Sequence, residues 1–149
     1  MLTKSAHRAE SATPDSINER IRQKTVETIA RTLAGGPQAI EARLRELERE
    51  WDTERVLETL ASSFTLSGLT LGVTVDRRWL ALPGVVAAFL LQHALQGWCP
   101  PLPLIRALGV RTTGEIDEER TALKAARGDF AQLANGSTPA SKLLEAATR

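Results

Sequence analysis

Two long stretches without a formal charge constrain this chain more than any other feature. Residues 59–75 and 79–105 contain no Asp, Glu, Lys or Arg, although 25% of the 149 residues are charged. A helix that crosses a bilayer needs about 17–25 apolar residues, so the first stretch reaches the lower limit and the second exceeds it. We therefore expect an all-α protein in which the two stretches form a two-helix transmembrane hairpin.

The apolar composition favours a pair of spans over a single span. Leu, Phe and Val each favour insertion by about 0.3–0.6 kcal/mol at a helix centre, so each stretch gains about 2–5 kcal/mol. Serines and threonines oppose insertion of the first stretch, and Pro83, Gln92, His93 and Gln96 oppose insertion of the second. In a pair, these polar groups can face one another. The alternative is a soluble bundle, but the flanking segments offer only narrow apolar stripes to cover two such helices.

Small residues at a spacing of four also favour close helix packing. Gly68 and Gly72 form a G-x-x-x-G pattern in the first stretch, and Gly84 and Ala88 form a related pattern in the second. Small side chains let helix backbones approach closely inside a membrane, where no hydrophobic effect drives helices together. We expect all four residues to take part in helix packing.

Two tryptophans bracket the second stretch. Trp79 and Trp98 are 19 residues apart, which is about 28 Å along a helix. This length matches the hydrocarbon thickness, and tryptophan prefers the membrane–water interface. Both residues are therefore predicted to be interface anchors.

The basic residues predict which ends face the cytoplasm. More of them flank the two stretches than lie in the turn between, which holds Arg77 and Arg78. Basic residues near membrane spans concentrate on the cytoplasmic side, so both termini are expected there. The flanking arginines are Arg43, Arg45, Arg49 and Arg55 before the stretches, and Arg106, Arg111 and Arg120 after them.

The chain divides into four expected regions. Residues 1–15 are polar, lack the apolar core of a signal peptide and are predicted to be a disordered tail. Residues 16–58 form a charged cytoplasmic helical region, and residues 59–112 form the two-span transmembrane domain. Residues 113–149 are predicted to be a cytoplasmic helix, opened by a Thr112–Glu115 capping box, followed by a flexible tail.

An apolar stripe in residues 38–58 predicts a binding face. Ile40, Leu44, Leu47 and Trp51 step by four, three and four between charged residues, which places them on one face of a helix. The stripe is too short for a convincing coiled coil. It fits an amphipathic helix that lies on the membrane surface or on a neighbouring helix, or one that contacts a second copy of the chain or another protein.

The end of the second stretch carries the candidate functional side chains. His93, Gln96 and Cys99 are spaced by three and share one helix face, which we expect to point at the partner helix. Interhelical hydrogen bonding is the favoured role of His93; a proton or ligand path is the alternative, and zinc would need more ligands than this chain supplies. Cys99 precedes prolines at a helix end, where the dipole raises the pKa of a thiol, so we expect slow reactivity.

The segment "GWCPPLPLIRALGVRT", from Gly97 to Thr112, resembles the small YgaP-like inner-membrane domain family. The Asp76-Arg77 turn also resembles that pattern, and the likeness covers roughly residues 50–112. The resemblance implies an inner-membrane two-helix hairpin. Some family members carry a rhodanese domain, which implies persulfide relay through Cys99, or export of a small anion linked to that chemistry, as an alternative function. Nothing here resembles a rhodanese domain, and the long charged N-terminal extension departs from the family.

Several function classes have no support in the sequence. A net charge of +1 predicts no nucleic-acid binding, and a single cysteine excludes an intramolecular disulfide. There is no phosphate-binding loop, dinucleotide fingerprint, Ser-His-Asp set or C-x-x-C pair, so we expect no catalytic residues, no cofactor and no metal. The preferred function is a non-enzymatic membrane or interaction module whose main partner is the lipid bilayer.

Overall fold

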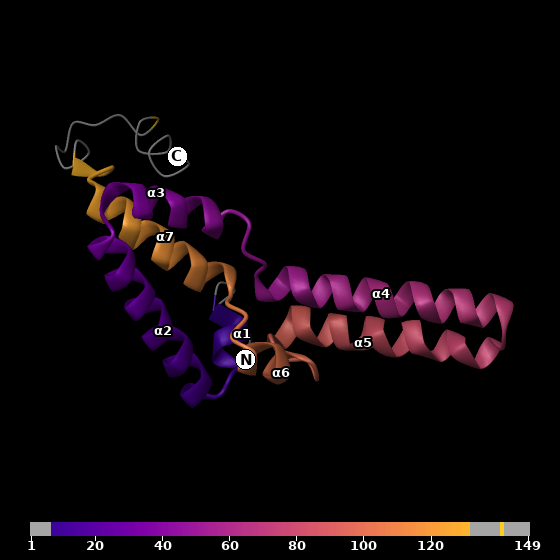
Figure 1. Ribbon diagram of the computed structural model, residues 1–149. Coiled ribbons are helices and arrows are strands. Elements are labelled where there is room, and N and C mark those ends of the chain that lie inside the picture. The colour runs from indigo at the N-terminus through magenta and orange to yellow at the C-terminus, as the bar shows by residue number, and fades with distance from the viewer. Residues whose placement is uncertain (1–6, 132–140, 142–149) are drawn as a thin grey trace. The chain divides into compact units, whose positions relative to one another are not determined.

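The computed structural model describes residues 7–131 and Ser141, and all regular elements among them are helical (Figure 1). The prediction of an all-α protein is therefore confirmed. The helices are α1 (Arg8–Ser11), α2 (Asp15–Ala34), α3 (Gly36–Leu47), α4 (Thr53–Thr74), the 3₁₀ helix η2 (Arg77–Leu80), α5 (Ala81–Gln96), α6 (Leu102–Ala107) and α7 (Thr113–Arg127). Among the described residues, 7–22 and 51–115 form one compact unit, and 23–50 and 116–131 form the other.

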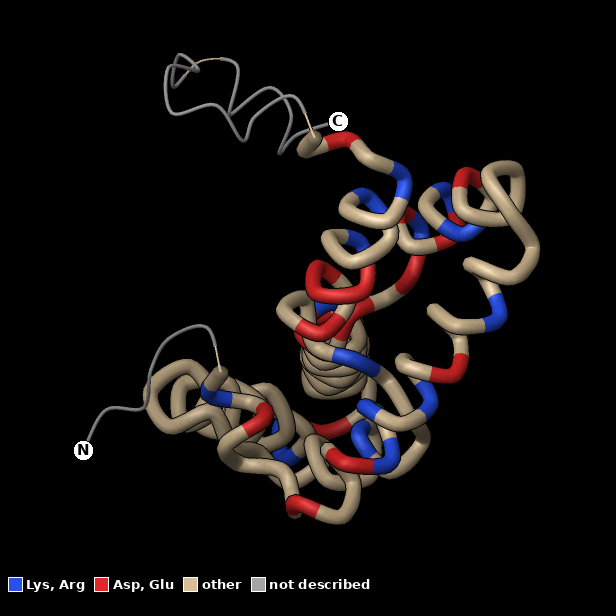
Figure 2. The backbone as a smooth tube through the Cα atoms, turned by 90° about the vertical axis from the view of Figure 1, so that its left-hand side faces the viewer, with Lys and Arg blue, Asp and Glu red and all other residues tan. Residues whose placement is uncertain are grey.

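Two helices in the first unit are long and apolar enough to cross a membrane, Thr53–Thr74 and Arg77–Gln96. Only 17% of the apolar window of the first and 6% of that of the second is buried within the described residues. The core helix of a soluble protein would be mostly buried instead. Basic and acidic residues are interspersed along the helices that come before and after this pair in the sequence (Figure 2).

The two long helices lie side by side (Figure 1), and the second of them approaches α4 closely at two glycines. A Cβ atom on Gly68 would lie 2.5 Å from Pro83 Cδ, and one on Gly72 would lie 2.5 Å from Leu80 Cδ2. A side chain at Gly68 would therefore collide with the proline ring, and one at Gly72 would require the Leu80 side chain to move. The structure places Gly84 differently, because a Cβ there would have no atom within 4 Å, and Ala88 is exposed. The second small-residue pattern thus faces away from α4.

This contrast predicts opposite outcomes for two matched substitutions. Gly68→Leu should separate α4 from α5 and lower the stability of the pair by about 1–2 kcal/mol, the range of interhelical contacts in membranes. Gly84→Leu should leave the pair intact, because its site is open. Thermal unfolding of both variants in mild detergent measures the difference. Equal melting temperatures would show that the Gly68 contact does not hold the helices together.

The N-terminal segment differs from the expected disordered tail. Residues 1–6 lie outside the described part, but α1 begins at Arg8, and Ala9 and Thr13 are buried. A Cβ on Gly97, whose φ is +77°, would lie 2.5 Å from Arg8 O, so α1 packs directly on the end of α5. Polar composition indicated disorder, but this tertiary contact orders the segment.

The expected helical region 16–58 is interrupted. α3 ends at Leu47, and α4 begins at Thr53, where the Asp52 carboxylate accepts a hydrogen bond of 2.7 Å from Arg55 N. Aspartate is a favoured N-cap, so it starts the long helix before the charge-free stretch begins. Trp51 consequently falls outside α3, and the Arg55 guanidinium lies 4.4 Å from its ring centroid.

The second unit buries most of the stripe that we expected to bind a partner. Ile40, Leu44 and Leu47 of α3 pack with Ile116 and Leu123 of α7 in one apolar cluster. The stripe therefore already has a partner within the chain. A protein partner of residues 38–58 would have to contact other residues, such as the exposed Trp51 or another face of α3.

One ion pair fixes the same two helices. Arg43 of α3 donates two hydrogen bonds, of 2.8 and 3.1 Å, to the fully buried carboxylate of Glu119 on α7. The hydrogen bonds to Glu119 raise the pKa of Arg43 well above its ordinary value. Two parallel N–H···O bonds add geometric specificity to the charge attraction.

The Thr112–Glu115 capping box is present at the start of α7. Glu115 N donates to Thr112 Oγ1 at 3.2 Å, and Thr112 N donates to Glu115 Oε2 at 2.8 Å. Gly128, with φ of +91°, follows the last residue of the helix, a position where glycine is favoured. The tail beyond residue 131 lies outside the described part, apart from Ser141.

Candidate functional site

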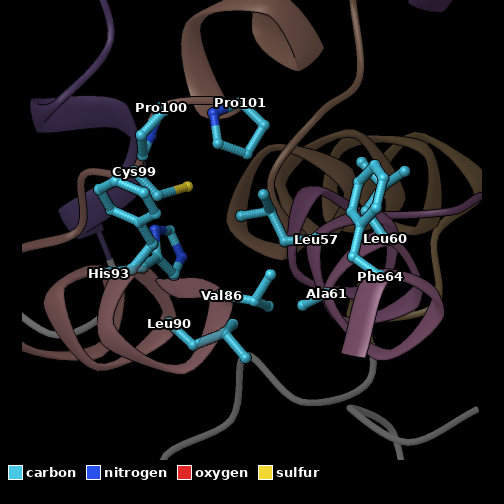
Figure 3. Close-up of a pocket in the computed structure, with 11 residues that line it drawn as sticks. Leu57, Leu60, Ala61, Phe64, Val86, Leu90, His93, Cys99, Pro100 and Pro101 are labelled. Atoms are coloured by element: carbon cyan, nitrogen blue, oxygen red, sulfur yellow. The ribbon is translucent and has the colours of Figure 1, made fainter. Parts of the chain in front are cut away.

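A cavity of about 410 Å³ lies between α4 and α5, away from their glycine contacts (Figure 3). Its volume falls within the about 300–1,000 Å³ typical of small-molecule sites. The residues that line it come from α4, α5 and the loop after α5: Leu57, Leu60, Ala61 and Phe64; Val86, Phe89, Leu90 and His93; Cys99, Pro100 and Pro101. Nine of these eleven side chains are aliphatic or aromatic hydrocarbons, so the cavity favours an apolar occupant.

The local sequence turns the chain over this cavity. α5 ends at Gln96 and is capped by Gly97, which adopts a left-handed conformation and donates a hydrogen bond of 2.7 Å to His93 O. Pro100 and Pro101 then prevent the helix from continuing. Cys99 is thereby brought beside His93 in the cavity wall (Figure 3), and it packs in a small core with Leu57 and Leu102.

His93 is the polar group of this end. It is buried, and its Nε2 lies 3.1 Å from Glu54 Oε2 on α4, so it forms the interhelical hydrogen bond. Glu54 Oε1 in turn lies 3.6 Å from an Arg8 Nη2 atom. Among the described residues, His93 Nδ1 has no hydrogen-bond partner. A carboxylate oxygen accepts hydrogen bonds, so Nε2 is the donor in this contact.

Cys99 lies in an environment that disfavours the thiolate. Burial raises the pKa of the thiol, a hydrogen bond from the Leu102 backbone partly offsets this, and the charge of Glu54 raises the pKa further. The main cause is therefore loss of hydration, whereas the sequence had indicated the helix dipole. A buried thiol with a raised pKa is a poor nucleophile at neutral pH.

We therefore expect Cys99 to react slowly with maleimide at pH 7, and faster only as the pH rises past the range of an ordinary thiol. The reference is Ala30→Cys, at an exposed position of α2, in a Cys99→Ser background. Time courses of labelling at several pH values, in mild detergent, provide the measurement. Equally fast labelling of both thiols at pH 7 would show that Cys99 is activated.

The structure brings together only part of the predicted polar stripe. His93 and Cys99 line the cavity, but Gln96 is exposed on another face of the helix end. Gln96 is three residues after His93 within α5, which turns it about 60° around the helix axis from His93. Cys99 reaches the cavity because the chain turns after the helix ends. Trp79 and Trp98 are both exposed, one in η2 and one just after α5.

Sequence reasoning missed the charged neighbours of the site. Glu54 precedes the charge-free stretch and lies in the predicted charged helical region, residues 16–58. Arg8 lies in the predicted disordered tail, residues 1–15. A carboxylate shortly before one apolar stretch is a candidate partner for a histidine in the other stretch. This reasoning could have indicated Glu54. No sequence signal indicated Arg8, because its position depends on the packing of α1 on Gly97.

A second group that escaped prediction surrounds Arg106, which is fully buried. Its guanidinium donates two hydrogen bonds of 2.6 Å to Glu115 and one of 2.8 Å to Asn18 Oδ1. It also donates to Thr13 Oγ1 and to Val110 O. These bonds tie the N-terminal segment to α6 and to the start of α7, which is a structural role.

Within residues 7–131 and Ser141, no group of three or more His, Cys, Asp or Glu side chains could hold a metal ion. Comparisons with protein-family models, with curated proteins and with solved structures find no match for this chain. The resemblance to the YgaP-like family therefore stays a prediction from the residues that suggested it.

Proposed function

We propose that this chain is a small integral inner-membrane protein that works as a non-enzymatic membrane module. In this proposal α4 and η2–α5 form a two-span transmembrane hairpin, and both termini lie in the cytoplasm. The single observation that carries the proposal is that two helices of spanning length have few fully buried residues, 17% and 6% of their apolar windows, within the described residues.

The exposed side chains support this location. Large apolar residues are exposed along both helices, among them Leu66 and Val73 of α4 and Leu91 and Leu95 of α5. Soluble monomers rarely expose contiguous apolar patches beyond a few hundred Å², whereas lipid covers such a surface without cost. The exposed Trp79 and Trp98 suit the two membrane–water interfaces.

Carbonate extraction of a membrane fraction tests the location. We expect the full chain to remain in the pellet, as integral proteins do. A truncated chain that lacks residues 53–96 is the control and should be released. Release of the full chain would end the membrane proposal and favour a soluble bundle.

Reporter fusions test the orientation. A fusion after Arg78 should report the far side of the membrane, and a fusion at the C-terminus should report the cytoplasm, because arginines concentrate near the termini. Identical signals from the two fusions would show that one helix does not span.

The charged helices before and after the hairpin are proposed to meet the headgroups or a protein partner. Because α7 already covers Ile40, Leu44 and Leu47, that contact would involve the charged, exposed face of α3. Its exposed members include Glu41 and Arg45, which pair with each other at 2.8 Å.

A further inference from the structure

We propose that the tip of the hairpin, residues 76–79 between α4 and α5, binds the phosphate groups of anionic phospholipids through the guanidinium groups of Arg77 and Arg78. This inference rests on the proposed two-span hairpin, because that arrangement brings the tip to the headgroups of the leaflet far from the termini. It adds a lipid class and a binding site to the general contact with the bilayer.

The charges of the tip stand alone in a long part of the chain. Between residues 59 and 105 the formally charged side chains are Asp76, Arg77 and Arg78, and all three are exposed. Asp76 Oδ1 accepts a hydrogen bond of 2.7 Å from Arg78 N, which occupies part of the carboxylate. Within the described part of the chain, neither guanidinium has an ion-pair partner. Two positive charges, set against one negative charge, are therefore available to an anion.

The backbone holds the tip in a defined conformation. Asp76 N donates to Leu71 O at 3.1 Å, and Trp79 N donates to Asp76 O, also at 3.1 Å. A Cβ on Gly72 would lie 3.3 Å from Leu80 N, so η2 packs directly on α4. The two arginines thus extend from a fixed turn, which lowers the entropy that is lost when an anion binds.

The neighbouring side chains suit the level of the headgroups. Val73 and Val75 before the arginines and Leu80 after them are exposed and apolar. Trp79 is also exposed, and tryptophan prefers the membrane–water interface. Long arginine side chains at the end of a span extend from the apolar layer toward the interface. In the proposed hairpin both guanidinium groups therefore reach the lipid phosphates.

The chemistry of the guanidinium group indicates the partner. Its planar set of N–H donors matches the oxygens of a phosphate, and such hydrogen bonds are charge-assisted. An anionic phospholipid has a net negative charge that complements the tip, whereas a zwitterionic headgroup carries a cation beside its phosphate. An acidic soluble protein has a complementary charge too, but it would not cover the exposed apolar residues on both sides of the arginines with hydrocarbon. An anionic phospholipid meets both requirements.

Quenching of Trp79 fluorescence by brominated lipids in proteoliposomes tests this inference. The full-length chain with Trp51→Phe and Trp98→Phe keeps Trp79 as its tryptophan, and bromine on an acyl chain quenches a tryptophan that the lipid touches. The same minor fraction of brominated phosphatidylglycerol or brominated phosphatidylcholine is mixed into unbrominated phosphatidylcholine. We expect the anionic lipid to occupy the tip about fivefold more readily, the effect of one net positive charge near a membrane surface. Equal quenching would overturn the inference in favour of an acidic soluble partner.

Three variants test the role of the charges. Arg77→Gln combined with Arg78→Gln should make the two brominated lipids equal at Trp79. Arg77→Lys combined with Arg78→Lys should retain most of the preference, because the charges stay. Asp76→Asn should strengthen the preference, because it removes the negative charge while an amide oxygen can still accept from the backbone.

The control is a chain that keeps Trp98 at the other end of α5, with Trp51→Phe and Trp79→Phe. The quenching of Trp98 should not respond to the double Gln substitution. A preference at Trp79 that survives this substitution, or an equal change at both tryptophans, would also contradict a site at the tip.

The same measurement keeps the two proposals apart. If neither brominated lipid quenches Trp79, the tip does not reach the bilayer, and the two-span hairpin fails. If both lipids quench it equally, the tip reaches the bilayer, and only the preference for an anionic lipid fails.

Discussion

Replacing Arg106 by methionine is expected to destabilise the first unit by about 3–5 kcal/mol, the range for breaking a buried ion pair by removing one partner. The guanidinium is fully buried, and the substitution removes the two hydrogen bonds that Arg106 donates to Glu115 and the one that it donates to Asn18 Oδ1. Among the described residues, Glu115 keeps only its hydrogen bond from Thr112 N. Methionine preserves most of the side-chain volume, so the loss reports the polar contacts and not a cavity.

Urea unfolding in mild detergent, followed by tryptophan fluorescence, measures this effect, because all three tryptophans of the chain lie in the first unit. The matched control is Arg20→Met, at an exposed position of α2 in the same unit. Surface substitutions of this kind usually change stability by less than about 0.5 kcal/mol. Midpoints that shift equally in the two variants would show that the Arg106 group does not hold the unit together.

Replacing Leu91 by arginine is expected to disrupt membrane insertion. Leucine favours insertion at a helix centre, and arginine opposes it, so the exchange costs about 3–4 kcal/mol. The second helix gains only about 2–5 kcal/mol from its Leu, Phe and Val residues, so most of that gain is lost. We expect the carbonate-resistant fraction to fall severalfold.

Leu108→Arg is the control for this substitution. Leu108 is 77% exposed and Leu91 is 62% exposed, but Leu108 lies after α6 and outside both spans. It should tolerate the charge because its surroundings are headgroups or water. Equal extraction of the two variants would show that the Leu91 position does not face hydrocarbon.

The helices could be predicted from sequence because their signals are local. Freedom from charge over a helix length predicted both long helices, and the Thr112–Glu115 box predicted the start of α7, since each depends on neighbours in the chain. The boundaries were less accurate: Asp52 starts α4 before the charge-free stretch, and α3 ends before Trp51.

The candidate site was only partly predictable because its contacts are not local. Gly68 and Gly84 belong to the same spacing pattern, yet only Gly68 meets the opposite helix, and the sequence does not say how each helix is rotated. The partners of buried charges were also missed. Glu54 meets His93, and Arg43 meets Glu119 across 76 positions, and tertiary packing alone selects such pairs.

Spin-label accessibility in nanodiscs tests most directly whether lipid surrounds α4 and α5. Single cysteines in a Cys99→Ser background would replace Leu66 and Leu91, which are exposed on the two helices, and Ala30 on α2 as the reference in water. We expect spin labels at Leu66 and Leu91 to collide readily with dissolved oxygen, because oxygen concentrates in hydrocarbon. The same labels should hardly collide with a water-soluble nickel complex, because hydrocarbon excludes it. The label at Ala30 should show the reverse. Nickel accessibility at Leu66 and Leu91 equal to that at Ala30, or exclusion of both reagents there, would contradict a helix pair in lipid.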